Sequence, residues 1–128
     1  MTQRSDTPPV LFLSHGAPPL ADDQRWTSEL ADWSGTFEKP KDILMISAHW
    51  ENAPVTLSAT RQKNELVYDF WGFDQKYYDV RYDAPMAPEL ANEVERLTSA
   101  YGHHVERDES RGLAHGAYVP LKEMVPDA

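Results

Sequence analysis

The sequence predicts an α/β fold, with a mostly parallel sheet flanked by helices in three layers. The prediction depends on two short, almost wholly apolar runs, Pro9–Ser14 and Ile43–Ala48, and on a segment of helical periodicity between them. Apolar runs of this length are typical of strands that are covered on both faces. Strand, helix and strand in this order form a βαβ unit, so we expect the two strands to be parallel neighbours.

The helix of this unit is predicted from Asp22 onward. Asp22 and Asp23 can cap its first turn or complement the helix dipole. Apolar side chains then recur at the spacing of one helix face, at Trp26, Leu30, Trp33 and Phe37. The run Glu38-Lys39-Pro40-Lys41 breaks the pattern and separates the helix from the second strand.

The rest of the chain predicts further, shorter elements. Residues Val55–Thr60 alternate between apolar and polar, which indicates a half-exposed strand near a sheet edge. Residues 61–85 are irregular and rich in aromatic side chains, so they form either core, a lid or the wall of a flat organic substrate.

The C-terminal third predicts two helices and a short strand. A helix begins at Pro88 and stops at Gly102, with one apolar face formed by Leu90, Val94, Leu97 and Tyr101. His103–Arg107 is a candidate strand, and Ala117–Met124 is a candidate last helix whose start is limited by Pro120. No repeat or linker divides the chain, so we expect a single domain over residues 1–128.

Composition and charge exclude several classes of function. The 128 residues contain 12 Lys and Arg against 21 Asp and Glu, a formal charge of -9 that disfavours nucleic acid as a partner. No apolar run approaches the length of a membrane span, and the N-terminus lacks the apolar stretch of a signal peptide, so we expect a cytoplasmic protein without a membrane partner. The absence of cysteine leaves His, Asp and Glu as metal ligands, a set that suits zinc or non-haem iron.

Two histidines follow the two predicted buried strands directly. His15 comes after the first run and His49 after the second. Ligands of parallel sheets lie beyond the carboxyl ends of the strands, and neighbouring strands are about 4.8 Å apart. The two imidazoles therefore emerge side by side and can share one divalent ion at about 2.0–2.1 Å each. The alternative is that both histidines only form hydrogen bonds, and the pattern does not decide between the two.

Three further side chains are candidates for the same site. His115, in an apolar segment bounded by glycine, can bind metal, donate a proton from a position beside it, or be a buried histidine satisfied by a backbone carbonyl. Glu51 and Asp69 are the carboxylates best placed to join, although solvated charge or loop capping is the commoner role for each. By contrast, His103 and His104 are expected at the surface or at an edge.

Four motifs occur in order along the chain. They are Leu13-Ser14-His15-Gly16-Ala17-Pro18, Ile46-Ser47-Ala48-His49-Trp50-Glu51, Tyr68-Asp69-Phe70-Trp71-Gly72-Phe73 and Leu113-Ala114-His115-Gly116-Ala117-Tyr118-Val119-Pro120-Leu121. Together they resemble the class III extradiol ring-cleavage dioxygenases, specifically the DOPA 4,5-dioxygenase-type branch related to the LigB-like catalytic subunits. The resemblance covers nearly the whole chain from Val10, and four motifs in order are more specific than any one of them.

The resemblance implies an enzyme that opens a catechol-type ring beside its two hydroxyls and incorporates both atoms of O₂. It implies one divalent ion, Fe(II) or Zn(II), with His15 and His49 matching the first two metal ligands and His115 matching the active-site histidine. The implied partners are a small aromatic diol and O₂, and association into a homo-oligomer is left open.

Family members are roughly twice as long as this chain. The resemblance places the remaining metal ligand and a further active-site histidine in their second half, so residues 1–128 correspond to the N-terminal half of the catalytic domain. We therefore expect an incomplete domain that binds metal weakly and turns over poorly. Two other functions remain open: a zinc-dependent hydrolase with a carboxylate base such as Glu51, and a non-catalytic metal-binding domain.

Overall fold

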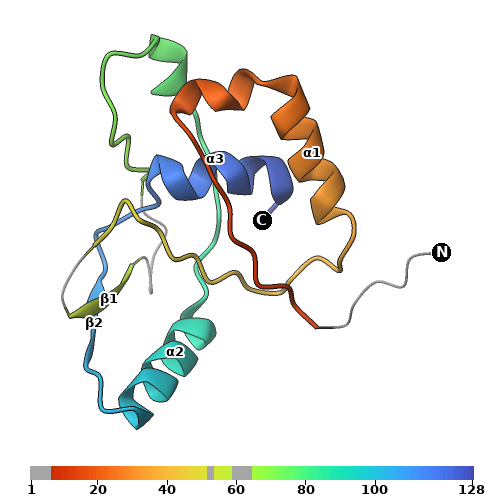
Figure 1. Ribbon diagram of the computed structural model, residues 1–128. Coiled ribbons are helices and arrows are strands. Elements are labelled where there is room, and N and C mark those ends of the chain that lie inside the picture. Colours follow the sequence, from red (N-terminus) through yellow and green to blue (C-terminus); the bar gives the residue numbers. More distant parts are fainter. Residues whose placement is uncertain (1–6, 52–53, 59–64) are drawn as a thin grey trace.

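The computed structural model describes residues 7–51, 54–58 and 65–128 of an α/β protein (Figure 1). Helices α1 and α3 lie together in one part of the molecule, and helix α2 lies with the two strands in the other. The fold class therefore agrees with the prediction, although the described residues do not form three layers. The elements in chain order are a 3-10 helix Pro18–Asp22, α1 Gln24–Ser34, β1 Val55–Ser58, a 3-10 helix Gln75–Tyr77, α2 Pro88–Ala100, β2 Val105–Asp108 and α3 His115–Met124.

The sheet of the described residues consists of β1 and β2. The two strands are parallel, with Val55 opposite Val105 and Ser58 opposite Asp108. Helix α2 connects them in sequence, so a βαβ unit exists, as parallel pairing requires. The short strands were predicted approximately: β2 begins two residues later than expected, and residues 59–60 of the predicted Val55–Thr60 strand lie outside the described residues.

The predicted buried strands Pro9–Ser14 and Ile43–Ala48 are wrong. Neither run belongs to a strand of the described sheet. In the first run Leu11 and Leu13 pack against Leu30 and its neighbours, whereas Val10 and Phe12 are fully exposed. The second run follows the same pattern, because its Met45 packs on the core while Ile46 is 88% exposed. An apolar run shows that a segment can be buried on both faces. To form a buried strand, it also needs neighbouring strands for its backbone hydrogen bonds and other segments packed on each face.

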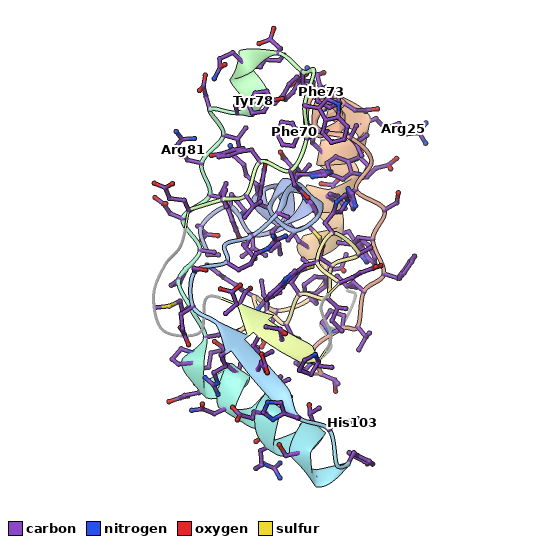
Figure 2. The ribbon with its side chains drawn as sticks, turned by 90° about the vertical axis from the view of Figure 1, so that its left-hand side faces the viewer. Arg25, Phe70, Phe73, Tyr78, Arg81 and His103 are labelled. Atoms are coloured by element: carbon purple, nitrogen blue, oxygen red, sulfur yellow. The ribbon has the colours of Figure 1, made fainter. Side chains whose placement is uncertain are left out.

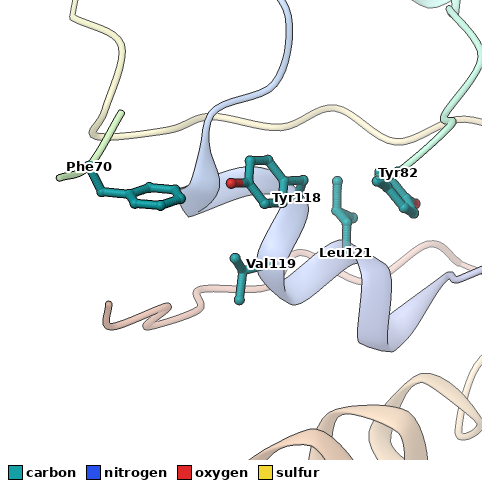
Figure 3. Packing of buried hydrophobic residues seen from close by; sticks show 5 residues of the cluster. All are labelled: Phe70, Tyr82, Tyr118, Val119 and Leu121. Carbon is teal, nitrogen blue, oxygen red and sulfur yellow. The ribbon is translucent and has the colours of Figure 1, made fainter. Parts of the chain in front are cut away.

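The core is built around α3 (Figure 3). Tyr118 and Pro120 are fully buried, and Val119 and Leu121 are nearly so. Phe70 and Tyr82, from the aromatic stretch, complete the main cluster. Burial of one such apolar side chain contributes about 1.5–3 kcal/mol, so this helix is a major source of stability. The aromatic stretch is therefore largely core, which was one of its predicted roles.

Helix α1 begins where the sequence predicts. The Asp23 carboxylate accepts hydrogen bonds from the backbone N–H of Arg25 and of Trp26, which caps the first turn. Leu30 is buried against α3 residues, but Trp33 on the same predicted face is 40% exposed. The helix ends at Ser34, so Phe37, the last residue of the predicted apolar face, lies beyond the helix.

The other two helices differ from prediction only in detail. Helix α2 has proline in its first turn, and the chain leaves it through Gly102 at φ 78°, a left-handed conformation that favours glycine. Helix α3 begins at His115, two residues earlier than predicted, and Pro120 lies inside it. No helix in the described part of the chain is long and apolar enough to cross a membrane.

Candidate metal centre

The three histidines of the resemblance lie together. His15 ends the first apolar run and is followed by Gly16 at φ 58°, where the chain turns into the first 3-10 helix. His49 lies on a turn in which the Ser47 hydroxyl accepts a hydrogen bond from the His49 N–H, and His115 is the first residue of α3. One ring nitrogen from each of the three histidines lies within 4.8 Å of the other two.

The predicted proximity of His15 and His49 is confirmed, although the strands expected to carry them are not formed. The Nε2 atoms of the two rings are 3.1 Å apart, and the ring centroids are 4.7 Å apart. The His115 ring centroid lies 5.1 Å from that of His15 and 4.3 Å from that of His49. Three segments that are far apart in the sequence thus converge at one point.

The contacts of the Nδ1 atoms determine what the Nε2 atoms present to each other. His15 Nδ1 lies 2.8 Å from the Gly16 carbonyl oxygen, and His49 Nδ1 lies 3.1 Å from Asp69 Oδ2. A carbonyl and an ionised carboxylate only accept hydrogen bonds, so both Nδ1 atoms carry the proton. In neutral rings both Nε2 atoms then present a lone pair, and a 3.1 Å approach of two lone pairs is favourable only with a cation or a proton between them.

Asp69 contacts the third histidine as well. Its Oδ1 lies 2.6 Å from His115 Nδ1 and accepts a hydrogen bond from the His115 backbone N–H at 3.1 Å. Partial burial raises the pKa of Asp69, but the hydrogen bonds from the ring and the backbone of His115 outweigh this effect, so the pKa lies below its usual value. Asp69 was a candidate in the sequence, with capping as the commoner alternative. It does cap α3, and it also holds two rings of the site.

A glycine that sequence reasoning did not single out makes room for the rings. A Cβ atom on Gly116 would lie 2.8 Å from His49 Cδ2 and 3.0 Å from His15 Nε2, closer than side chains approach one another. The second position of α3 is therefore restricted to glycine if His15 and His49 keep their places. The signal in the sequence was a glycine adjacent to His115 in a segment predicted to enter a helix.

The donor set fits a divalent metal ion. Two nitrogens bound to one ion at about 2.0–2.1 Å each lie about 2.9–3.4 Å apart, whether the angle at the metal is octahedral or tetrahedral. The His15–His49 distance of 3.1 Å falls in this range. The contacts of Nδ1 with a carbonyl and with a carboxylate are of the kind that metal-binding histidines usually make on the side away from the metal.

The remaining candidates lie elsewhere. Glu51 is exposed, and the group of candidate ligands found among the described residues contains only the three histidines. His104 Nε2 lies 3.6 Å from Oε1 of Glu106, a residue of β2. His103 is exposed and lies at the opposite end of the molecule from Phe70 and Phe73 (Figure 2). His103 and His104 are therefore at the surface, as the sequence predicted.

Aromatic and apolar surfaces surround the cluster. The Phe70 ring is 5.6 Å from the His115 ring and edge-on to it, and it also stacks on Tyr78 at 4.7 Å. A cavity of about 1120 Å³ lies behind the site, lined by Trp50 and Ala114, the sequence neighbours of His49 and His115, but not by the histidine rings. Phe70 therefore covers one side of the His115 ring, and this cavity reaches the sequence neighbours of the histidines rather than the rings themselves.

These features define a class of protein: an α/β chain with a cluster of three histidines that could hold a metal ion. The sequence pattern of the family described as "Catalytic LigB subunit of aromatic ring-opening dioxygenase" matches residues 8–128. The chain belongs to this family.

Several curated proteins are similar to this chain. A 4,5-DOPA dioxygenase extradiol of Beta vulgaris is 42% identical over 124 residues, which cover 93% of this chain and 46% of the relative. The corresponding protein of Portulaca grandiflora is 38% identical, over 91% of this chain and 45% of its own length. The 4,5-DOPA dioxygenase extradiol of Escherichia coli K12 is 33% identical, over 94% of this chain and 44% of its own length. The chain thus spans about half the length of the curated relatives it matches.

Proposed function

We propose that this chain supplies part of the active site of a metal-dependent extradiol dioxygenase that opens a catechol-type ring with O₂. The observation that carries the proposal is the pair of His15 and His49 Nε2 atoms, 3.1 Å apart, with each Nδ1 atom close to an oxygen acceptor. Membership of the ring-opening dioxygenase family and the names of the relatives support the choice of reaction.

In this proposal His15 and His49 hold one divalent ion, Fe(II) or Zn(II). Two neutral imidazoles suit both ions, and the donor set does not decide between them. When bound, the ion supplies Lewis acidity toward the two hydroxyls of the diol and places the diol beside O₂. The protein's part is to keep the two Nε2 lone pairs directed at one point, which the Gly16 carbonyl and the Asp69 carboxylate do through Nδ1.

His115 serves as the catalytic acid–base group. Its Nδ1 donates to Asp69, so its Nε2 is the nitrogen left to accept a proton from a substrate hydroxyl and to return it. The side chain is buried, which limits the access of bulk water to that proton.

The two alternatives have less support. A zinc-dependent hydrolase needs a carboxylate base beside the ion, and Glu51, the expected residue, is exposed and outside the histidine cluster. Asp69 is beside the cluster, but both of its oxygens face histidine nitrogens: Oδ1 lies 2.6 Å from His115 Nδ1, and Oδ2 lies 3.1 Å from His49 Nδ1. A non-catalytic metal-binding domain makes the same contacts and is separated from an enzyme only by experiment. A cytoplasmic location and a homo-oligomeric state stay predictions.

A coloured catechol tests the proposal without requiring rapid turnover. The chain is loaded with Fe(II) under anaerobic conditions and titrated with 4-nitrocatechol, whose visible absorption shifts to longer wavelength when a metal removes its phenolic protons. We expect the shift with the wild-type chain and its loss in His15→Ala and in His49→Ala. His103→Ala, which changes an exposed histidine at the far end of the molecule, is the matched control and should behave as wild type.

Admission of air completes the test. We expect O₂ uptake that depends on both Fe(II) and the catechol, with a yellow ring-opened product and a low rate. His115→Ala should retain the anaerobic spectral shift but lose O₂ uptake. Metal binding that survives both His15→Ala and His49→Ala contradicts the metal assignment. Zinc-dependent ester or amide hydrolysis without O₂ uptake contradicts the proposed reaction.

A further inference from the structure

We propose that Asp69 is a positioning residue that fixes the tautomer of two site histidines at once. It acts through His49 and His115 rather than on substrate or metal. The part of this inference that concerns metal affinity rests on the proposed function above. The part that concerns the histidine rings does not, because it can be observed in the metal-free chain.

Each oxygen of the carboxylate has its own histidine. Oδ1 faces His115 Nδ1 at 2.6 Å and also accepts from the His115 backbone N–H at 3.1 Å. Oδ2 faces His49 Nδ1 at 3.1 Å. An ionised carboxylate has no proton to donate, so both rings must carry their proton on Nδ1. The unprotonated nitrogen of each ring is therefore Nε2, and His49 Nε2 is the atom that faces His15 Nε2.

The position of the carboxylate is set by the backbone rather than by a flexible side chain. Val67 pairs with Ala114 in an isolated parallel bridge, and the Val67 N–H donates to the Leu113 carbonyl at 2.8 Å. This bridge holds the segment that contains Asp69 against the start of α3. The cap residue of α3, Ala114, has no side chain able to cap, so the Asp69 carboxylate takes that role from another segment.

The variant Asp69→Asn keeps the shape of the side chain but changes which hydrogen bonds it can form. The Asn side chain has nearly the same shape but offers one acceptor oxygen and one donor NH₂. The oxygen should stay at the Oδ1 position, because Asp69 Oδ1 is the acceptor of the His115 backbone N–H among the described residues. The NH₂ group then faces His49 Nδ1, which must give up its proton to accept. In Asp69→Asn, His49 therefore carries its proton on Nε2 and can no longer offer that atom to a metal.

Nitrogen NMR of ¹⁵N-histidine-labelled protein reads this change directly. Spectra of the metal-free chain are recorded at alkaline pH, and the two ¹⁵N shifts of each ring distinguish the Nδ1–H tautomer, the Nε2–H tautomer and the imidazolium. In the wild type we expect His49 and His115, the two rings that Asp69 contacts, as Nδ1–H tautomers. In Asp69→Asn we expect His49 alone to change to Nε2–H. The control Asp32→Asn, an exposed aspartate on α1, should leave both rings unchanged.

Zinc titration of the same samples measures the consequence. We expect Asp69→Asn to lose about 10- to 100-fold in zinc affinity, the usual effect of removing a hydrogen-bond partner of a metal-binding histidine, while Asp32→Asn keeps the wild-type affinity. A similar melting temperature and far-ultraviolet circular dichroism for the two variants will show that the fold is retained.

The outcomes separate the two claims. A wild-type spectrum with His49 or His115 as the Nε2–H tautomer overturns the inference without any variant. An Asp69→Asn spectrum in which His49 keeps its wild-type tautomer, or an unchanged zinc affinity, also overturns it. If the tautomers change as expected but the wild-type chain binds no zinc or iron, Asp69 is still the positioning residue and the proposed function fails.

Discussion

Helix α3 and the two apolar runs 9–14 and 43–48 have similar composition but different surroundings. In α3 six residues from His115 to Leu121 are buried, and Tyr118 is only 1% exposed. In the two runs Val10 and Phe12 are fully exposed and Ile46 nearly so. The difference teaches that apolar composition shows what a segment tolerates, whereas burial depends on which other segments are present to cover it.

The histidine cluster lies where these two regions meet. His115 is buried at the start of α3, and His49 and His15 come from the exposed runs. The rings are therefore anchored unequally: His115 by the core, His15 by the contact of its Nδ1 with the Gly16 carbonyl, and His49 by the 3.1 Å contact of its Nδ1 with Asp69. The following predictions test this contrast between a packed and an exposed region.

The largest expected effect comes from a matched pair of leucine substitutions. Leu121→Ala removes a buried side chain of α3 and should lower the free energy of unfolding by about 2–5 kcal/mol. Leu44→Ala removes the same atoms from a side chain that is 53% exposed and should cost less than about 1 kcal/mol. Urea unfolding measures both, and equal losses would show that the two regions are not packed differently.

Gly116→Ala should change the free energy of unfolding less than Leu121→Ala does, but it should specifically weaken zinc binding. Alanine is the better helix former by about 1 kcal/mol, so the helix itself should not suffer. Its Cβ would lie 2.8 Å from His49 Cδ2, however, and would displace the rings. We expect a loss of zinc affinity of at least about tenfold, measured by titration.

Gly35→Ala is the control for this substitution, because its Cβ would meet only backbone oxygens at the end of α1. Zinc binding should be unchanged in this variant. Wild-type affinity in Gly116→Ala would show that the rings have room to move and that α3 does not constrain them.

Two tyrosines of the main cluster should respond in opposite directions to loss of the hydroxyl. Tyr82 donates to the Val125 carbonyl at 2.8 Å, so Tyr82→Phe should lower the free energy of unfolding by about 1 kcal/mol. The Tyr118 hydroxyl is buried and has no hydrogen-bond partner among the described residues. Tyr118→Phe should therefore be neutral or stabilising by about 1 kcal/mol. A clear loss in Tyr118→Phe would reveal a partner for this hydroxyl.

The same two side chains predict a smaller change with pH. Burial raises the pKa of Tyr82 and of Tyr118 above the usual value of a phenol. The folded chain then keeps protons that the unfolded chain releases above a pH of about 10. Stability should be constant below that pH and fall as the pH rises through the folded-state values. Urea midpoints between pH 8 and about 11 should fall less in Tyr118→Phe; identical slopes would contradict the assignment.

The parts of the fold that could be predicted were those with local signals. Asp23 capping α1, proline at the start of α2 and Gly102 after its end follow from the chemistry of those residues alone. The runs 9–14 and 43–48 were mispredicted because their strand character depends on distant partners. Helix α3 began earlier than expected, because Pro120 is accommodated inside the helix.

The candidate site was predicted better than the fold around it. His15 and His49 were expected together because they followed two similar runs, and they are together although neither run is a strand. The shared role of Asp69 could not be predicted, since it depends on the bridge between Val67 and Ala114, which brings segments 47 residues apart into register. The space kept free by Gly116 likewise appears only when the three segments are assembled.

The central claim is that His15 and His49 share one ion through their Nε2 atoms. The most direct measurement is NMR of the ¹⁵N-histidine-labelled chain loaded with ¹¹³Cd, in which a scalar coupling between cadmium and nitrogen identifies each bound atom. We expect couplings from a single cadmium signal to Nε2 of His15 and to Nε2 of His49. Coupling to only one of the two rings, to their Nδ1 atoms, or to His103 or His104 instead would contradict the account.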